Sequence, residues 1–200
     1  MEEFYKLFLE FDAIYIYIIL FSFAFIENIV PPLPSDTFIV LGGTLINSNG
    51  LLFFSSLVCT SLGSVLGFML MFYFGFTIAE KINENKFFKF LTPESISKVN
   101  KLFEKWGYGV IVLNRFLPGT RAVVSFCAGL AKMKFKIVTA ICFVSSLAWN
   151  SLLLYVGSNI GNNIETINSF FKTYYQMAWI ILGSLVLIIL IRFIYQKFVK

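Results

Sequence analysis

Long apolar runs separated by short polar segments dominate this chain, and the length of each run predicts how it meets a membrane. An α-helix rises 1.5 Å per residue, so about 20 apolar residues cross the roughly 30 Å hydrocarbon layer of a bilayer. Three uninterrupted runs reach that length, at residues 51–79, 137–157 and 177–195. We predict transmembrane helices over about 51–79 and 137–157, and a third, C-terminal one within residues 174–196.

Two further apolar stretches, residues 14–46 and 107–131, are interrupted by proline, which lacks the amide donor that a helix interior needs. Each arm of the second stretch has about 11 residues and gives only ~16 Å of helix, too short to cross. We predict that both stretches form re-entrant hairpins, whose half-helices meet near the middle of the membrane. A kinked full span is the alternative for the first stretch, because its leading arm, residues 14–30, is nearly long enough to cross.

The two halves of the chain resemble each other at a nearly constant separation. Gly43 corresponds to Gly129, for example, and Gly75 corresponds to Gly157. A copy with one hairpin and one span crosses the membrane an odd number of times, so the second copy starts from the opposite face. We therefore predict an all-α integral membrane protein of two inverted repeats, each a re-entrant helical hairpin plus a transmembrane helix. Chance similarity between apolar segments is the alternative.

Residues 80–105 form the main polar stretch, in which apolar side chains recur at helical spacing. Pro93 marks a fresh helix start, since proline is favoured at the first helical position. We predict a pair of amphipathic helices on the membrane surface. The predicted topology places most lysines and arginines, including those at the C-terminus, on this same face. This excess of positive charge predicts that the connector and the C-terminus are cytoplasmic.

The N-terminal residues 1–13 carry Phe4, Leu7, Phe8 and Phe11 at helical spacing. This pattern predicts an interfacial amphipathic helix, and the alternative is the first turn of the segment that follows. Acidic residues stand where a signal peptide requires basic ones, so we expect no cleavage.

The composition agrees with a chain surrounded by lipid and excludes several kinds of enzyme. Hydrophobic residues make up 58% of the chain and charged residues 14%, against about 25% charged in globular domains. No histidine is present, which excludes a Ser-His-Asp triad and histidine-ligated zinc or haem. The three cysteines lack CxxC spacing, so we expect no metal and no cofactor. The net charge is +5, and most of the lysines lie between the predicted membrane segments, so this charge does not indicate nucleic-acid binding.

Four ionisable residues lie inside the interrupted stretches: Glu27, Asp36, Arg115 and Arg121. A charge within a membrane is costly and normally faces a cavity or another charge. The two acids and two arginines could therefore neutralise each other in pairs and clamp one hairpin tip to the other. Asp36, like Ser35 before it, is also a normal N-cap for the helix that follows.

A functional interpretation of the same charges is an anion site at the hairpin tips. The predicted tip residues are Pro31, Pro34, Ser35, Pro118, Gly119 and Thr120. Helix N-termini there would point positive dipole ends into a cavity, where the guanidiniums of Arg115 and Arg121 match the forked geometry of a phosphate. Glu27 or Asp36 could carry a proton coupled to that anion.

Three segments carry a combination of motifs that is more specific than any one of them. The first leads from Glu27 through the prolines to Asp36, the second is Arg-Phe-Leu-Pro-Gly-Thr-Arg at residues 115–121, and the third includes Trp149 and Asn150. This combination resembles the DedA family of bacterial membrane proteins, also described as the SNARE-associated or VTT domain family. Asp36 stands where the family commonly has glutamate, which shortens the side chain but keeps the charge.

The resemblance implies a membrane domain over residues 14–162 that translocates lipid. Family members are thought to recycle undecaprenyl phosphate across the bacterial cytoplasmic membrane with a proton or sodium gradient, and eukaryotic relatives to scramble phospholipids. The residues matching Glu27, Asp36, Arg115 and Arg121 are those that the family is thought to need. We therefore expect a multi-pass lipid transporter in the bacterial cytoplasmic membrane, with the two arginines holding the phosphate and the two acids coupling a cation.

Three other functions remain open at this stage. A gradient-independent phospholipid scramblase would use the same fold. An intramembrane lipid-phosphate enzyme needs a nucleophile or base, although we expect no catalytic residue here. Without histidine, that nucleophile or base could come only from Glu27, Asp36, Ser35 or Thr120. A scaffold would act through residues 80–105.

Two polar residues of the last predicted span, Trp149 and Asn150, also allow two interpretations. They could line the lipid path, or Asn150 could form a hydrogen bond between helices. An oligomer is compatible with the sequence.

Overall fold

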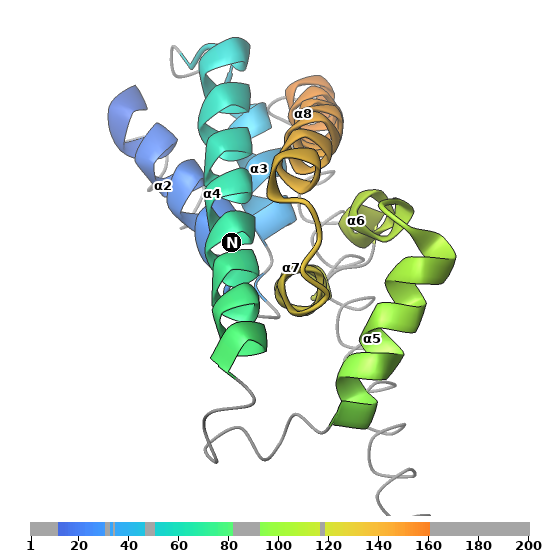
Figure 1. The fold of residues 1–200 in the computed structure, drawn as a ribbon. Coiled ribbons are helices and arrows are strands. Elements are labelled where there is room, and N and C mark those ends of the chain that lie inside the picture. The colour runs from blue at the N-terminus through green and yellow to red at the C-terminus, as the bar shows by residue number, and fades with distance from the viewer. Residues whose placement is uncertain are drawn as a thin grey trace, which may run out of the picture. The chain divides into compact units, whose positions relative to one another are not determined.

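The computed structural model of this protein describes residues 12–30, 33, 35–46, 51–81, 93–116 and 119–160. Every regular element among them is a helix, so the predicted all-α class is confirmed for this part of the chain (Figure 1). The elements are α2 (Ala13–Ile26), α3 (Ser35–Thr44), α4 (Phe53–Lys81), α5 (Pro93–Trp106), α6 (Gly109–Leu113), the 3-10 helix η2 (Asn114–Phe116), α7 (Arg121–Leu130) and α8 (Phe135–Ile160).

The helices α4 and α8 are long and apolar enough to cross a membrane. They coincide with the predicted spans over residues 51–79 and 137–157, which are thereby confirmed as helices. Residues 1–11 of the predicted interfacial helix and the predicted C-terminal transmembrane helix within 174–196 lie outside the described residues.

Each interrupted stretch contains two helices with a break between them. In the first, α2 ends at Ile26 and α3 begins at Ser35; in the second, α7 begins at Arg121. The five prolines of the chain include those at the predicted tips, and Pro31, Pro34 and Pro118 lie outside the described residues.

The first arm of the second stretch is shorter than predicted. The surface helix α5 starts at Pro93, as predicted, and continues to Trp106. Gly107 then adopts a positive φ of 55°, a conformation that favours glycine and ends a helix. The helix that restarts, α6, has only five residues before the backbone tightens into η2. Residues 82–92, which include the rest of the predicted connector helices, are not described.

Glycines allow the helix backbones to approach closely. Gly63 and Gly67 of α4 face the carbonyl groups of Phe21 and Phe25 in α2, so a side chain at either glycine would meet backbone. This close contact follows from the small-residue spacing Gly-x-x-x-Gly, which lets two helices pack backbone to backbone.

Two further glycine pairs join the first half of the chain to the second. A Cβ atom added to Gly43 of α3 would lie 2.9 Å from the Cα atom of Gly157 in α8. Likewise, a Cβ atom added to Gly129 of α7 would contact the backbone of α4 one turn from Gly75. Helix α3 therefore packs on α8, whereas α7 packs on α4.

Helices α4 and α8 lie antiparallel, so the end of α4 is next to the start of α8. The Thr139 hydroxyl donates to the sulfur of Met69 at 3.1 Å, and Asn150 donates to Ser61 at 3.3 Å. An apolar core occupies the side nearer the end of α4 and the start of α8. Its buried residues are Val65, Phe68, Phe72, Phe103, Ile111, Ala128, Val138 and Cys142.

Candidate functional site

The four charged residues from the interrupted stretches are all buried. Glu27, which follows the last residue of α2, is 1% exposed, and Asp36, the second residue of α3, is 5% exposed. Arg115 lies in η2 and Arg121 begins α7, at 4% and 1% exposure. All four therefore lie where a helix ends or begins, as the sequence predicts.

Arg121 is paired with both carboxylates. Its Nη1 donates to Oε2 of Glu27, and its Nη2 lies 2.8 Å from both carboxylate oxygens of Asp36. The Ser35 hydroxyl also donates to Oε2 of Glu27, and the indole Nε1 of Trp149 lies 3.3 Å from Oδ1 of Asp36. Ion pairs therefore join the two stretches, as the alternative interpretation of these charges allows, and one arginine forms both of them.

Arg115 has different surroundings, because no carboxylate in the described part of the chain forms an ion pair with it. Its Nη2 donates to the hydroxyl of Ser146 and lies 3.8 Å from the sulfur of Cys142, both on α8. Its Nη1 has no hydrogen-bond partner among the described residues. A buried guanidinium in this state has an unused donor and an incompletely compensated charge.

The acidic side of the cluster also has an unused group. Oε2 of Glu27 accepts from Arg121 and Ser35, whereas Oε1 has no partner within the described segments. If all four residues are ionised, their formal charges add to zero, yet the pairing is unequal. One arginine contacts both acids, while one donor of Arg115 and one acceptor of Glu27 have no partner among the residues that the structure describes.

The local structure holds these side chains in place. The Thr120 hydroxyl donates to Oδ1 of Asn114 at 2.8 Å and ties the start of α7 to η2. Gly119 has a φ of 79°, so the turn that precedes Arg121 needs a glycine. The ring of Phe116 meets the ring of Trp149 edge-on at 5.1 Å between centroids.

The predicted lining residues Trp149 and Asn150 are consecutive on α8 and contact different partners. Trp149 contacts the charge cluster directly through Asp36. Asn150 is fully buried, and its Nδ2 donates to the hydroxyl of Ser61 on α4, so the hydrogen bond between helices is present. Sequence reasoning missed Ser146, which lies one helical turn before Asn150; that spacing of two polar residues on one helix face was the available signal.

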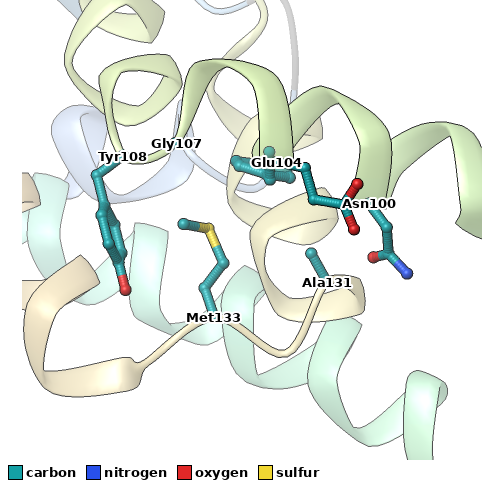
Figure 2. A pocket seen from close by; sticks show the side chains of 7 residues that line it. Asn100, Glu104, Gly107, Tyr108, Ala131 and Met133 are labelled. Atoms are coloured by element: carbon teal, nitrogen blue, oxygen red, sulfur yellow. The ribbon is translucent and has the colours of Figure 1, made fainter.

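A surface pocket of about 430 Å³ lies between α5 and the turn from α7 to α8 (Figure 2). Its lining residues are Asn100, Phe103, Glu104, Gly107, Tyr108, Ala131 and Met133. None of the four clustered charges lines this pocket. Among the described residues, no group of three cysteine, aspartate or glutamate side chains is placed to hold a metal ion.

The sequence matches the family model of the VTT domain over residues 33–159. The chain belongs to the VTT-domain family. The match extends from the start of α3 almost to the end of α8 and includes Asp36, Arg115 and Arg121, whereas Glu27 precedes it. Membership of this family, which includes DedA, confirms the resemblance seen in the motifs.

Several bacterial proteins are similar to this VTT-domain chain over most of its length. A protein of Lactococcus lactis subsp. lactis named alkaline phosphatase-like protein is 32% identical over 86% of this chain and 84% of its own. Undecaprenyl phosphate transporter A of Staphylococcus aureus is 21% identical over 94% of this chain and 95% of its own. Protein DedA of Escherichia coli is 27% identical over 74% of this chain and 70% of its own.

No solved structure matches the VTT-domain chain significantly. Its family, its composition and its two long apolar helices together identify an integral membrane protein.

Proposed function

We propose that this protein transports a lipid phosphate, most directly undecaprenyl phosphate, across the bacterial cytoplasmic membrane, coupled to a proton or sodium gradient. The observation that carries the proposal is the buried pair of arginines, of which Arg115 has one donor without a partner in the described part of the chain. A guanidinium binds a phosphate through parallel hydrogen bonds. The name of the Staphylococcus aureus relative, undecaprenyl phosphate transporter A, agrees with this substrate.

The proposal includes two inverted repeats, each a re-entrant hairpin and a span, within residues 14–162. The packing supports it: α3 of the first half lies on α8, and α7 of the second half lies on α4. If α3 is exchanged with α7 and α4 with α8, the same two helix pairs result. The glycine contacts are related in the same way, since Gly43 meets Gly157 and Gly129 lies near Gly75. Binding sites of such transporters lie where the repeats meet.

The starts of the two equivalent helices support a site at that junction. Asp36 near the start of α3 and Arg121 at the start of α7 occupy corresponding positions and contact each other. Residues near a pseudo-twofold axis meet their own counterparts, so this contact supports an axis close to the pair. Helix N-termini there favour an anion.

The pairing of Arg121 suggests how a cation is coupled to the lipid. A phosphate approaching Arg121 competes with Glu27 and Asp36 for the same donors. A proton or sodium ion on either carboxylate weakens its hold on Arg121, which then becomes available to the phosphate. Cation binding and phosphate binding therefore favour each other, as linkage requires. In this mechanism, Arg115 attracts the phosphate first and Arg121 completes the site.

The membrane orientation is part of the proposal. The connector at residues 80–105 and the C-terminus face the cytoplasm, because the lysines and arginines concentrate there.

Reconstitution into liposomes tests this function against its rivals. Purified protein is placed in vesicles that contain a fluorescent polyprenyl phosphate, and the label reaching the opposite leaflet is followed with a proton gradient, a sodium gradient or none. The proposal expects faster translocation with at least one gradient. Equal rates under all three conditions would instead support a scramblase.

The same vesicles distinguish an enzyme from a transporter. The Lactococcus lactis relative's name, alkaline phosphatase-like protein, makes release of inorganic phosphate the specific alternative. Ser35, whose hydroxyl bonds to Glu27, would then be the candidate nucleophile. Release of inorganic phosphate that stops in Ser35→Ala would contradict the transporter proposal.

A further inference from the structure

The buried interior changes from apolar to polar along α4. On the side toward the end of α4, its inward residues Val65, Phe68 and Phe72 belong to the apolar core. Toward its start, the inward residues are hydroxyl-bearing and fully buried. They are Ser56, Thr60, Ser61 and Ser64.

Helix α8 adds further buried polar side chains and joins those of α4 to the charge cluster. Ser146, which accepts a hydrogen bond from Arg115, and Asn150 are both fully buried and one turn apart. Asn150 in turn donates to Ser61 on α4 at 3.3 Å. A series of polar groups therefore runs from Arg115, which borders the apolar core at Cys142, through Ser146 and Asn150 of α8 to Ser61 of α4.

Several oxygens of this surface have no hydrogen-bond partner within the described residues. They are the Oγ atoms of Ser56 and Ser64 and the Oδ1 atom of Asn150. Buried polar groups in folded proteins are nearly always hydrogen-bonded, often to internal water. Lipid supplies no partner at this depth. Hydroxyl and amide oxygens are also ligands that a sodium ion accepts, and water among them can relay a proton.

We propose that Ser61, Ser64 and Asn150 line a hydrated path that leads a small monovalent cation to Glu27 and Asp36 from the Phe53 end of α4. That a cation moves along this path rests on the proposed gradient coupling, whereas the presence of water in the path does not. On the other side, the rings of Phe68 and Phe72 close the interior to ions. The path thus gives the cation access from one face, which by the charge asymmetry is the outer one.

Silver ion tests the path directly, because it is a monovalent cation of similar size to sodium and reacts with thiols. Ser61→Cys and Ser64→Cys place a thiol in the path, and Ala128→Cys places one in the apolar core. Silver is added to one face of sealed vesicles, and the protein is then denatured and treated with a maleimide. Mass spectrometry measures the protection of each cysteine separately, so the native cysteines stay in place.

We expect silver to reach the two path cysteines at least about tenfold faster than Ala128→Cys, since an apolar core excludes ions. The reaction is expected from the face at the start of α4 alone. Equal rates at all three positions, or faster reaction at Ala128→Cys, would overturn the proposal. Because this measurement requires no lipid movement, its outcome is independent of whether the protein transports lipid.

Asn150→Leu tests whether the path serves coupling. We expect it to reduce gradient-driven translocation of polyprenyl phosphate about tenfold while binding of that lipid without a gradient is unchanged. Asn150→Gln restores part of the rate, and Asn159→Leu, on the exposed surface of α8, is the matched control. Loss under a sodium gradient alone identifies sodium as the cation, and loss under a proton gradient alone identifies the proton. An Asn150→Leu protein that responds fully to both gradients would contradict this role.

Discussion

Replacing Arg121 with methionine removes the cation that contacts both buried carboxylates. Methionine keeps much of the apolar stem, so the main change is electrostatic. Glu27 and Asp36 are only 1% and 5% exposed, so bulk solvent does not replace the ion pair that either carboxylate loses. Removing one partner of a buried ion pair destabilises a protein by about 3–5 kcal/mol. Because two carboxylates lose their partner here, we expect a loss near the upper end, about 5 kcal/mol.

A second variant separates this electrostatic effect from a packing effect. In the triple variant Glu27→Gln, Asp36→Asn and Arg121→Met, no uncompensated carboxylate remains. We expect it to recover at least half of the stability lost by Arg121→Met, while lipid transport is absent from both proteins. For Arg115→Met we expect no comparable loss of stability from an unpaired carboxylate, since Arg115 forms no ion pair with the described residues.

The assay is the free energy of unfolding in mixed micelles, measured by denaturant titration for each variant. Lys101→Met, on the exposed side of α5, is the control and should change the stability by no more than about 0.5 kcal/mol. A loss of about 5 kcal/mol corresponds to more than three orders of magnitude in the unfolding equilibrium. An Arg121→Met protein as stable as the wild type would show that the two carboxylates do not depend on Arg121, contrary to this expectation.

Three further outcomes are expected. Arg115→Lys should lower lipid-phosphate translocation by about tenfold or more without unfolding the protein, because an ammonium cannot reproduce the fork of a guanidinium; an unchanged rate would argue against direct phosphate contact. Gly129→Ala should reduce stability by about 3 kcal/mol or more, since its Cβ would overlap the carbonyl oxygen of Phe72 and lie 2.8 Å from the amide nitrogen of Phe76, whereas Gly109→Ala meets nothing within 4 Å and serves as the control. Trp149→Phe should lose about 1 kcal/mol with its hydrogen bond to Asp36, measured by the same titration.

The long helices were predictable from the sequence because lipid sets their length. The predicted spans end within a few residues of α4 and α8, since a run of about 20 apolar residues has few alternatives to a helix. Prolines likewise predicted the breaks. The point at which α6 restarts was not predictable, because Gly107 could equally have continued a helix, whereas in the structure it adopts a positive φ.

The charge cluster was predictable in composition but not in its pairing. Four charges in apolar surroundings need partners, so their convergence follows from the cost of burial. Arg121 contacts both acids, whereas Arg115 contacts Ser146. This pairing depends on how α7 packs across α4 and how α3 packs across α8. Glycine contacts between distant segments set these crossings, and a single sequence does not reveal which glycines meet.

The initial rate of polyprenyl phosphate translocation in reconstituted vesicles is the most direct test of the proposed transport. Wild type, Arg115→Ala and Lys101→Ala are compared at equal protein density, with the gradient that drives the wild type. We expect Arg115→Ala to lose translocation and Lys101→Ala to retain it, because Arg115 is the buried cation whose Nη1 has no hydrogen-bond partner among the described residues. Equal rates for wild type and Arg115→Ala would contradict it.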